Sequence, residues 1–179
     1  MRGSVVLMLA GLALDPLSTA AAFAEDPPLL TLSTGAAEIF DSHQEIYWGV
    51  EYRPAFRFFH VGPWLSFGTG KQREFYAAIG GLLDVELGCG WVLTPSFGAG
   101  YYSASDGLDL GFDAEFRTAI ELAKRFGNGQ RLGLCFAHLS NGSLGDENPG
   151  TETLGLSFSR PLDFLFRRAP AGAVPERTE

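Results

Sequence analysis

The sequence predicts an all-β fold, an eight-stranded antiparallel transmembrane β-barrel. Three observations support this prediction: eight segments with a period of two residues, charges in the middle of the more polar strand face, and an amino-terminal export signal. Segments of about 10 residues can cross a membrane at a tilt, and an even number of antiparallel strands can close without leaving an edge. The predicted strands are 29–37, 44–53, 59–69, 73–87, 91–103, 112–125, 131–141 and 151–162.

The amino terminus has the pattern of a secretory signal peptide. Arg2 precedes an apolar run that stops before Asp15, and residues 22–24 form an A-x-A cleavage site. An uncleaved membrane anchor would need about 20 apolar residues. Cleavage after residue 24 leaves 179 − 24 = 155 residues, enough for one domain. We expect three parts: a signal peptide (1–24), an outer-membrane β-barrel (25–162) and a disordered C-terminal tail (163–179).

The composition agrees with a barrel and excludes one class of partner. Hydrophobic residues make up 46% of the chain and charged residues only 19%, which is below the usual quarter or so. Aromatic residues and glycine, which suit strands and tight turns, are frequent. The net charge of −8 leaves no basic surface to neutralise phosphates, so we expect no nucleic-acid partner.

The sixth predicted strand shows the alternation most clearly. Its apolar positions are Phe112, Ala114, Phe116, Thr118, Ile120 and Leu122, and the positions between them are Asp113, Glu115, Arg117, Ala119, Glu121 and Ala123. Charges in mid-strand suit the polar interior of a membrane barrel whose apolar face contacts outer-membrane lipids. A soluble periplasmic β-domain, with its charged faces toward water, is the alternative.

Some aromatic and cysteine positions allow more than one interpretation. Trp48, Trp64 and Trp91 lie near strand ends, where they fit either interfacial girdles or a core. Cys89 falls in a turn and Cys135 in mid-strand, so we expect no disulfide between them.

The connections assign a side to each end of the barrel. With the amino terminus in the periplasm, the Asn-Gly turn at 127–130 lies on the periplasmic side of the membrane. The longer acidic connection around 103–111 then lies on the extracellular side. The seventh strand then runs outward. His138 and Ser140, near the outer end of this strand, are therefore expected at the outer leaflet.

His138 and Ser140 form the core of a candidate catalytic group. Their spacing of two puts both side chains on one strand face, and a turn at Asn148-Pro149-Gly150 would return Glu152 beside His138. A serine, a base and a carboxylate that orients the base are the parts of a nucleophilic triad. This face is otherwise apolar, with Leu132, Leu134 and Phe136 on one strand and Leu154, Leu156 and Phe158 on the next.

The run His138-Leu139-Ser140-Asn141, followed by Asn148-Pro149-Gly150 and Glu152, resembles the signature of the lipid A 3-O-deacylase family, PagL. The resemblance implies an eight-stranded outer-membrane esterase of Gram-negative bacteria that hydrolyses the 3-O-linked acyl chain of lipid A in lipopolysaccharide. It makes Ser140 the nucleophile, His138 the general base and Glu152 the third member of the triad.

The same resemblance implies an oxyanion site. Its candidates are Asn148 and the backbone amides near Gly142 and Ser143, with Asn141 in a supporting role. No cofactor and no metal are expected. A non-catalytic small barrel that binds lipid or protects the envelope is the alternative from another class of function, and a homodimer is left open.

Overall fold

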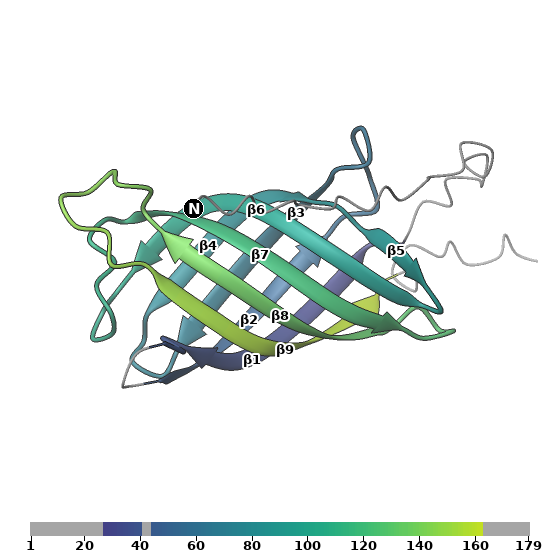
Figure 1. The fold of residues 1–179 in the computed structure, drawn as a ribbon, viewed down its shortest axis with the longest axis horizontal. Helices are drawn as coiled ribbons and strands as arrows, with labels where there is room; N and C mark the ends of the chain where they lie inside the picture. The colour runs from purple at the N-terminus through teal and green to yellow at the C-terminus, as the bar shows by residue number, and fades with distance from the viewer. Residues whose placement is uncertain (1–26, 41–43, 163–179) are drawn as a thin grey trace, which may run out of the picture.

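The computed structural model describes residues 27–40 and 44–162 (Figure 1). The predicted signal peptide and C-terminal tail lie outside these residues, and within them no helix is long and apolar enough to cross a membrane. The strands are β1 (Leu29–Ala37), β2 (Glu45–Arg53), β3 (Gly62–Gly70), β4 (Phe75–Leu82), β5 (Val85–Gly88), β6 (Trp91–Ser103), β7 (Ala114–Arg125), β8 (Arg131–Ser140) and β9 (Thr151–Pro161).

The sheet closes on itself. Its strand order is β4-β3-β2-β1-β9-β8-β7-β6-β5, and an additional pairing joins β4 to β6. β1 pairs with β9 along its whole length, from Leu29 opposite Pro161 to Ala37 opposite Thr153. β4 and β5 lie one after the other beside β6, so the nine strands fill eight positions. The chain is therefore a closed eight-stranded antiparallel β-barrel, as the sequence predicts.

The fourth predicted strand, 73–87, is interrupted at Leu83 and Asp84. Leu83 donates its N–H to Pro95 O at 3.0 Å, but proline has no N–H to return, so the ladder with β6 breaks here. Asp84 turns toward the barrel interior, where Arg131 Nη1 donates to its carboxylate at 3.1 Å. The prediction of one continuous strand is wrong at this proline.

The third predicted strand, 59–69, begins only at Gly62. The residues before it form a separate tight turn, closed by a bridge between Phe58 and Val61. The alternation of side chains in this segment continues that of β3, which is why the sequence pattern does not separate the two.

The two faces of the barrel wall have opposite polarity. Apolar side chains cover the outside, where the more exposed ones include Ile46, Trp48, Phe67, Ile79, Phe97, Leu132, Leu134, Leu154 and Leu156. Polar side chains are buried on the inside, among them Thr31, Arg53, Thr94, Glu121, Arg131, Ser157 and Ser159. A soluble domain would show the reverse, so this pattern identifies a barrel that is surrounded by lipid.

Trp64 belongs to the interior, whereas Trp48 and Trp91 lie on the exposed surface. Trp64 is 2% exposed, and its indole N–H donates to Gly81 O at 3.1 Å. A Cβ at Gly80 or Gly98 would come within 2.5 Å of its ring, so two glycines on neighbouring strands make room for it. The core interpretation is correct for this tryptophan.

Ion pairs cross the barrel interior. Arg53 on β2 donates to Glu121 on β7 through both terminal nitrogens, at 3.3 and 3.1 Å, and to Glu51 through Nε at 2.7 Å. Arg117 lies 3.8 Å from Glu51 and stacks on Trp64. These contacts satisfy charges that the barrel removes from water.

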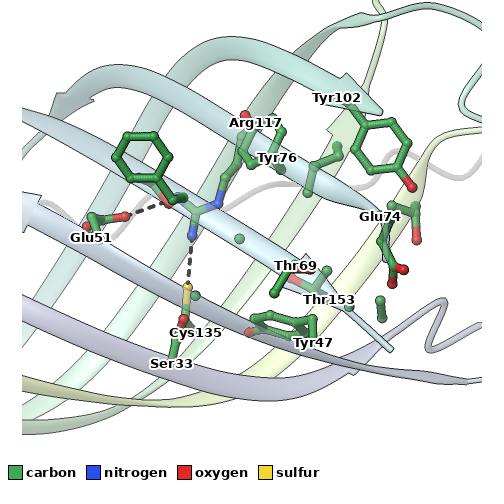
Figure 2. A pocket seen from close by; sticks show the side chains of 18 of the residues that line it. Ser33, Tyr47, Glu51, Thr69, Glu74, Tyr76, Tyr102, Arg117, Cys135 and Thr153 are labelled. Carbon is green, nitrogen blue, oxygen red and sulfur yellow. Dashed lines mark hydrogen bonds and ion pairs between the residues drawn. The ribbon is translucent and has the colours of Figure 1, made fainter. Parts of the chain in front are cut away.

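Beside this network lies a cavity of about 120 Å³ inside the barrel, lined by polar side chains and tyrosines (Figure 2). Figure 2 shows Arg117 between Glu51 and Cys135, and its Nη2 lies 3.6 Å from the Cys135 sulfur. Cys89 and Cys135 are both free thiols, in agreement with the sequence prediction. A cavity of this size and polarity suits a few water molecules.

We expect Arg53→Met to destabilise the barrel by about 3–5 kcal/mol, because it leaves Glu51 and Glu121 buried with their shared cation removed. Urea unfolding in detergent micelles, followed by tryptophan fluorescence, measures this loss. The control is Asp106→Asn, which removes a charge from an exposed loop position. A loss below about 1 kcal/mol, the value typical of a surface pair, would contradict a structural role for the network.

Candidate active site

The candidate site is built by β8 and β9 at the end of the barrel where residues 141–150 connect them. In the antiparallel register of these strands, His138 lies directly opposite Glu152. Their side chains meet, with His138 Nδ1 3.0 Å from Glu152 Oε1. The contact fixes which ring nitrogen faces the carboxylate and leaves Nε2 as the nitrogen available to another group.

The site faces outward, toward lipid, and not into the cavity of Figure 2. Leu139 and Thr151 line that cavity, so their alternating neighbours His138, Ser140 and Glu152 lie on the other side of the wall. The side chain of His138 is 45% exposed and that of Glu152 is 28% exposed. The imidazole is thus accessible to a molecule in the surrounding membrane.

Ser140 is the last residue of β8 and lies opposite Phe116 of β7. It shares the outward face with His138 at a spacing of two residues, which is about 7 Å along the strand. Among the described residues no hydrogen bond joins its hydroxyl to His138. Such contacts are often long in enzymes without substrate and shorten when substrate binds.

Gly150 packs against the edge of the imidazole. Its φ is 65°, and a Cβ at this position would lie 3.1 Å from His138 Cε1 and 3.2 Å from Leu139 O. Glycine therefore allows the backbone to approach the ring closely at the entry to β9. The sequence indicates Gly150 only as part of a turn, and its contact with His138 depends on the register of β8 and β9.

Asn141 organises the connection that follows Ser140. It is fully buried, and its Nδ2 donates to Leu110 O at 2.9 Å and to Glu147 O at 2.7 Å. Its Oδ1 accepts from Ser143 N at 2.8 Å. One side chain thus ties the site to the β6–β7 loop and to both halves of its own loop.

The three oxyanion candidates differ in whether their N–H groups already donate a hydrogen bond within the loop. The Ser143 amide donates to Asn141 Oδ1, so it is used within the loop. The side-chain oxygen of Asn148 accepts from Asn141 N at 3.0 Å, which leaves the NH₂ group of Asn148 to donate elsewhere. Gly142, with φ 61°, lies against the Phe116 ring beside Ser140. Asn148 and Gly142 are the candidates whose geometry leaves a donor available.

The environment of Ser140 is apolar on its β7 side. The rings of Phe97 and Phe116 stack with their centroids 6.0 Å apart, and Phe116 is the register partner of Ser140. In the described parts of the chain, no three His, Cys, Asp or Glu side chains are grouped as metal ligands. The arrangement places a serine hydroxyl, an imidazole paired with a carboxylate, and an apolar wall on one face of the barrel.

The apolar exterior, polar interior and closed sheet define an outer-membrane β-barrel, and this one carries Ser140, His138 and Glu152 on its lipid-facing wall. The sequence model of the lipid A 3-O-deacylase (PagL) family matches residues 40–161. The chain belongs to this family and is an outer-membrane protein. Comparison with curated protein sequences gives no match.

Solved structures show the same fold. The crystal structure of the outer membrane enzyme PagL is 16% identical, with a TM-score of 0.60 over 75% of this chain and 99% of that one. Neisserial surface protein A is 10% identical, with a TM-score of 0.50 over 75% and 95% of the two chains. A de novo designed transmembrane β-barrel gives 10% identity and a TM-score of 0.50 over 75% and 96%.

We expect Asn141→Ala to loosen the 141–150 connection, because two donated hydrogen bonds and one accepted bond are lost. Asn141→Asp keeps the acceptor but not the donors, so it should have nearly the same effect. At roughly 1 kcal/mol per bond, amide hydrogen exchange across 141–150 should accelerate about tenfold or more.

Mass spectrometry of exchange in detergent micelles measures this change. Asn128→Ala is the matched control, since Asn128 is exposed in the turn at the opposite end of the barrel. Unchanged exchange in Asn141→Ala would show that other contacts hold the connection.

Proposed function

We propose that this protein is an esterase that hydrolyses the 3-O-linked acyl chain of lipid A in lipopolysaccharide, with Ser140, His138 and Glu152 as its triad. The observation that carries this proposal is the 3.0 Å contact between His138 Nδ1 and Glu152 Oε1, on the lipid-facing wall and beside Ser140. Membership of the lipid A 3-O-deacylase family supports the choice of substrate.

The position of the site suits a substrate that is itself part of the membrane. In outer-membrane barrels the longer connections are extracellular, and here 104–113 and 141–150 lie at the same end as the site. Lipopolysaccharide occupies the outer leaflet, so its ester groups and the triad lie at a similar depth. Outward apolar side chains such as Phe136 and Leu154 would contact the acyl chains.

Acylation begins when Ser140 Oγ attacks the carbonyl carbon of the ester. His138 Nε2 accepts the hydroxyl proton, and Glu152 stabilises the resulting imidazolium through Nδ1. As the tetrahedral intermediate collapses, the bond to the sugar oxygen breaks and His138 returns the proton to that oxygen. The acyl group is then held as an ester on Ser140.

Deacylation repeats these steps with water as the nucleophile. His138 Nε2 takes a proton from the water as it attacks the acyl carbonyl, and gives that proton back to Ser140 Oγ as the fatty acid leaves. The NH₂ of Asn148 and the N–H of Gly142 are the proposed donors to the oxyanion in both halves of the reaction.

Mass spectrometry of lipid A from cells that express the protein tests the reaction. We expect the loss of one hydroxyacyl group, and no loss with Ser140→Ala, because the nucleophile is gone. The matched control is Ser105→Ala, at an exposed position of the 104–113 loop.

Intact cells and detergent-solubilised membranes should both be assayed, so that an enzyme that is latent in cells is still detected. The same mass loss with Ser140→Ala would refute the triad. Unchanged lipid A in both preparations, with the barrel shown to be folded, would refute the esterase and favour a non-catalytic barrel.

Steady-state kinetics on purified lipopolysaccharide tests the other roles. We expect Asn148→Ala to lower kcat by about 10²–10³, the usual cost of one oxyanion donor. Asn148→Asp keeps an oxygen for Asn141 N, so a similar loss in this variant would separate oxyanion stabilisation from loop support. Glu152→Gln should cost up to about 10⁴, because the tautomer of His138 is no longer fixed. Near-normal turnover in Asn148→Ala would contradict its assignment.

A further inference from the structure

The connection between β2 and β3 is an ordered hairpin at the end of the barrel opposite the candidate site. Phe58 and Val61 exchange two backbone hydrogen bonds of 2.9 Å. The two residues between them, Phe59 and His60, have φ of 46° and 71°. Positive φ at both central positions is typical of a type I′ turn, which usually takes Asn-Gly and is uncommon for bulky side chains. The chain thus adopts an unfavourable backbone conformation with an aromatic residue at the tip.

This hairpin exposes its aromatic side chains. Phe56 is 60% exposed, Phe58 is 68% exposed and Phe59 is 83% exposed. The rings of Phe58 and Phe59 contact each other edge to face, with centroids 4.6 Å apart. A cluster of this kind is costly in water and marks a surface that contacts apolar material.

The charged side chain of the hairpin, Arg57, points the other way, whereas His60 is exposed at the tip. Arg57 Nη1 donates to Pro54 O at 3.0 Å, and Arg57 Nη2 lies 3.5 Å from Asp84 Oδ2, whose side chain is 9% exposed. The guanidinium also lies against Gly62, at a buried position of β3. Arg57 therefore fixes the hairpin to the polar side of the wall and leaves the phenylalanines on the outside.

The lipid-facing surface continues onto the hairpin. Val61 lies against Gly81 of β4 and is itself 41% exposed. Figure 1 shows the segment between β2 and β3 projecting sideways from the barrel wall, near the end where β5 lies. Exposed apolar side chains of that end include Val85, Leu87 and Trp91.

From these observations we propose that residues 54–61 form a membrane anchor whose phenylalanines insert into the periplasmic leaflet of the outer membrane. The turn end of such a barrel is periplasmic, so phospholipid is the apolar phase beside it. Aromatic side chains favour the boundary between headgroups and acyl chains. The anchor holds one side of the barrel at a fixed depth, and it does not depend on the esterase activity.

Spin labelling in vesicles of phosphatidylethanolamine and phosphatidylglycerol tests the anchor. A nitroxide is attached at Phe59→Cys in the full chain, with the exposed Cys89 replaced by serine and the buried Cys135 left in place. Matched labels at Leu134→Cys, on the lipid-facing wall, and at Asp106→Cys, in an exposed loop, give the two reference environments. Collision rates with oxygen and with a water-soluble nickel chelate are measured at each position.

We expect the label at position 59 to resemble that at 134, with oxygen collisions at least several-fold more frequent than nickel collisions. Nickel access equal to that at 106 would place the hairpin in water and overturn the proposal. Low access of both reagents would show that protein covers the hairpin, from a second copy or another partner, and would overturn it as well. Folding of each of the three labelled proteins in vesicles is checked separately by its resistance to unfolding in unheated sodium dodecyl sulfate, and only folded protein is compared.

Discussion

Closure of the sheet is the constraint on which the rest of the structure depends. In lipid every backbone N–H and C=O must find a partner within the protein, and the pairings of β1 with β9 and of β4 with β6 leave no full-length edge. Once the cylinder is closed, the two-residue period decides which side chains meet lipid and which are enclosed. The polar interior, the apolar exterior and the position of the candidate site all follow from this division.

The same constraint explains why the candidate triad does not lie in a cavity. His138 and Glu152 are opposite each other in register and on the outward face, so their contact is made on the surface that a membrane lipid reaches. An interior ion pair stabilises the neighbouring strand: Arg53 donates to Glu121 on β7, and β7 pairs with β8. Strands β8 and β9 hold the proposed base and carboxylate, and the loop between them contributes Asn141 and the oxyanion candidates.

Local sequence patterns predicted most of this architecture, because the alternation of apolar and polar residues and the turn signals both depend on neighbouring positions in the sequence. The eight strand positions and the meeting of His138 with Glu152 required only period and turn signals. What could not be predicted depends on distant partners. Pro95 interrupts β4 from across the ladder, and Asn141 is buried because Leu110 of another loop accepts its amide. The Ser143 amide donates to Asn141 Oδ1, only two residues away, but the position of that side chain depends on its contact with Leu110 O.

The central claim is that a serine on the lipid-facing wall is the nucleophile, and the most direct test is covalent labelling of the folded barrel with a fluorophosphonate. Mass spectrometry of the digested protein then locates the adduct. We expect one phosphonyl group on the peptide that contains Ser140, and at least about a hundredfold slower labelling in His138→Ala, because the base is lost. An adduct on another residue, or labelling of Ser140 at the same rate without His138, would contradict the proposed triad.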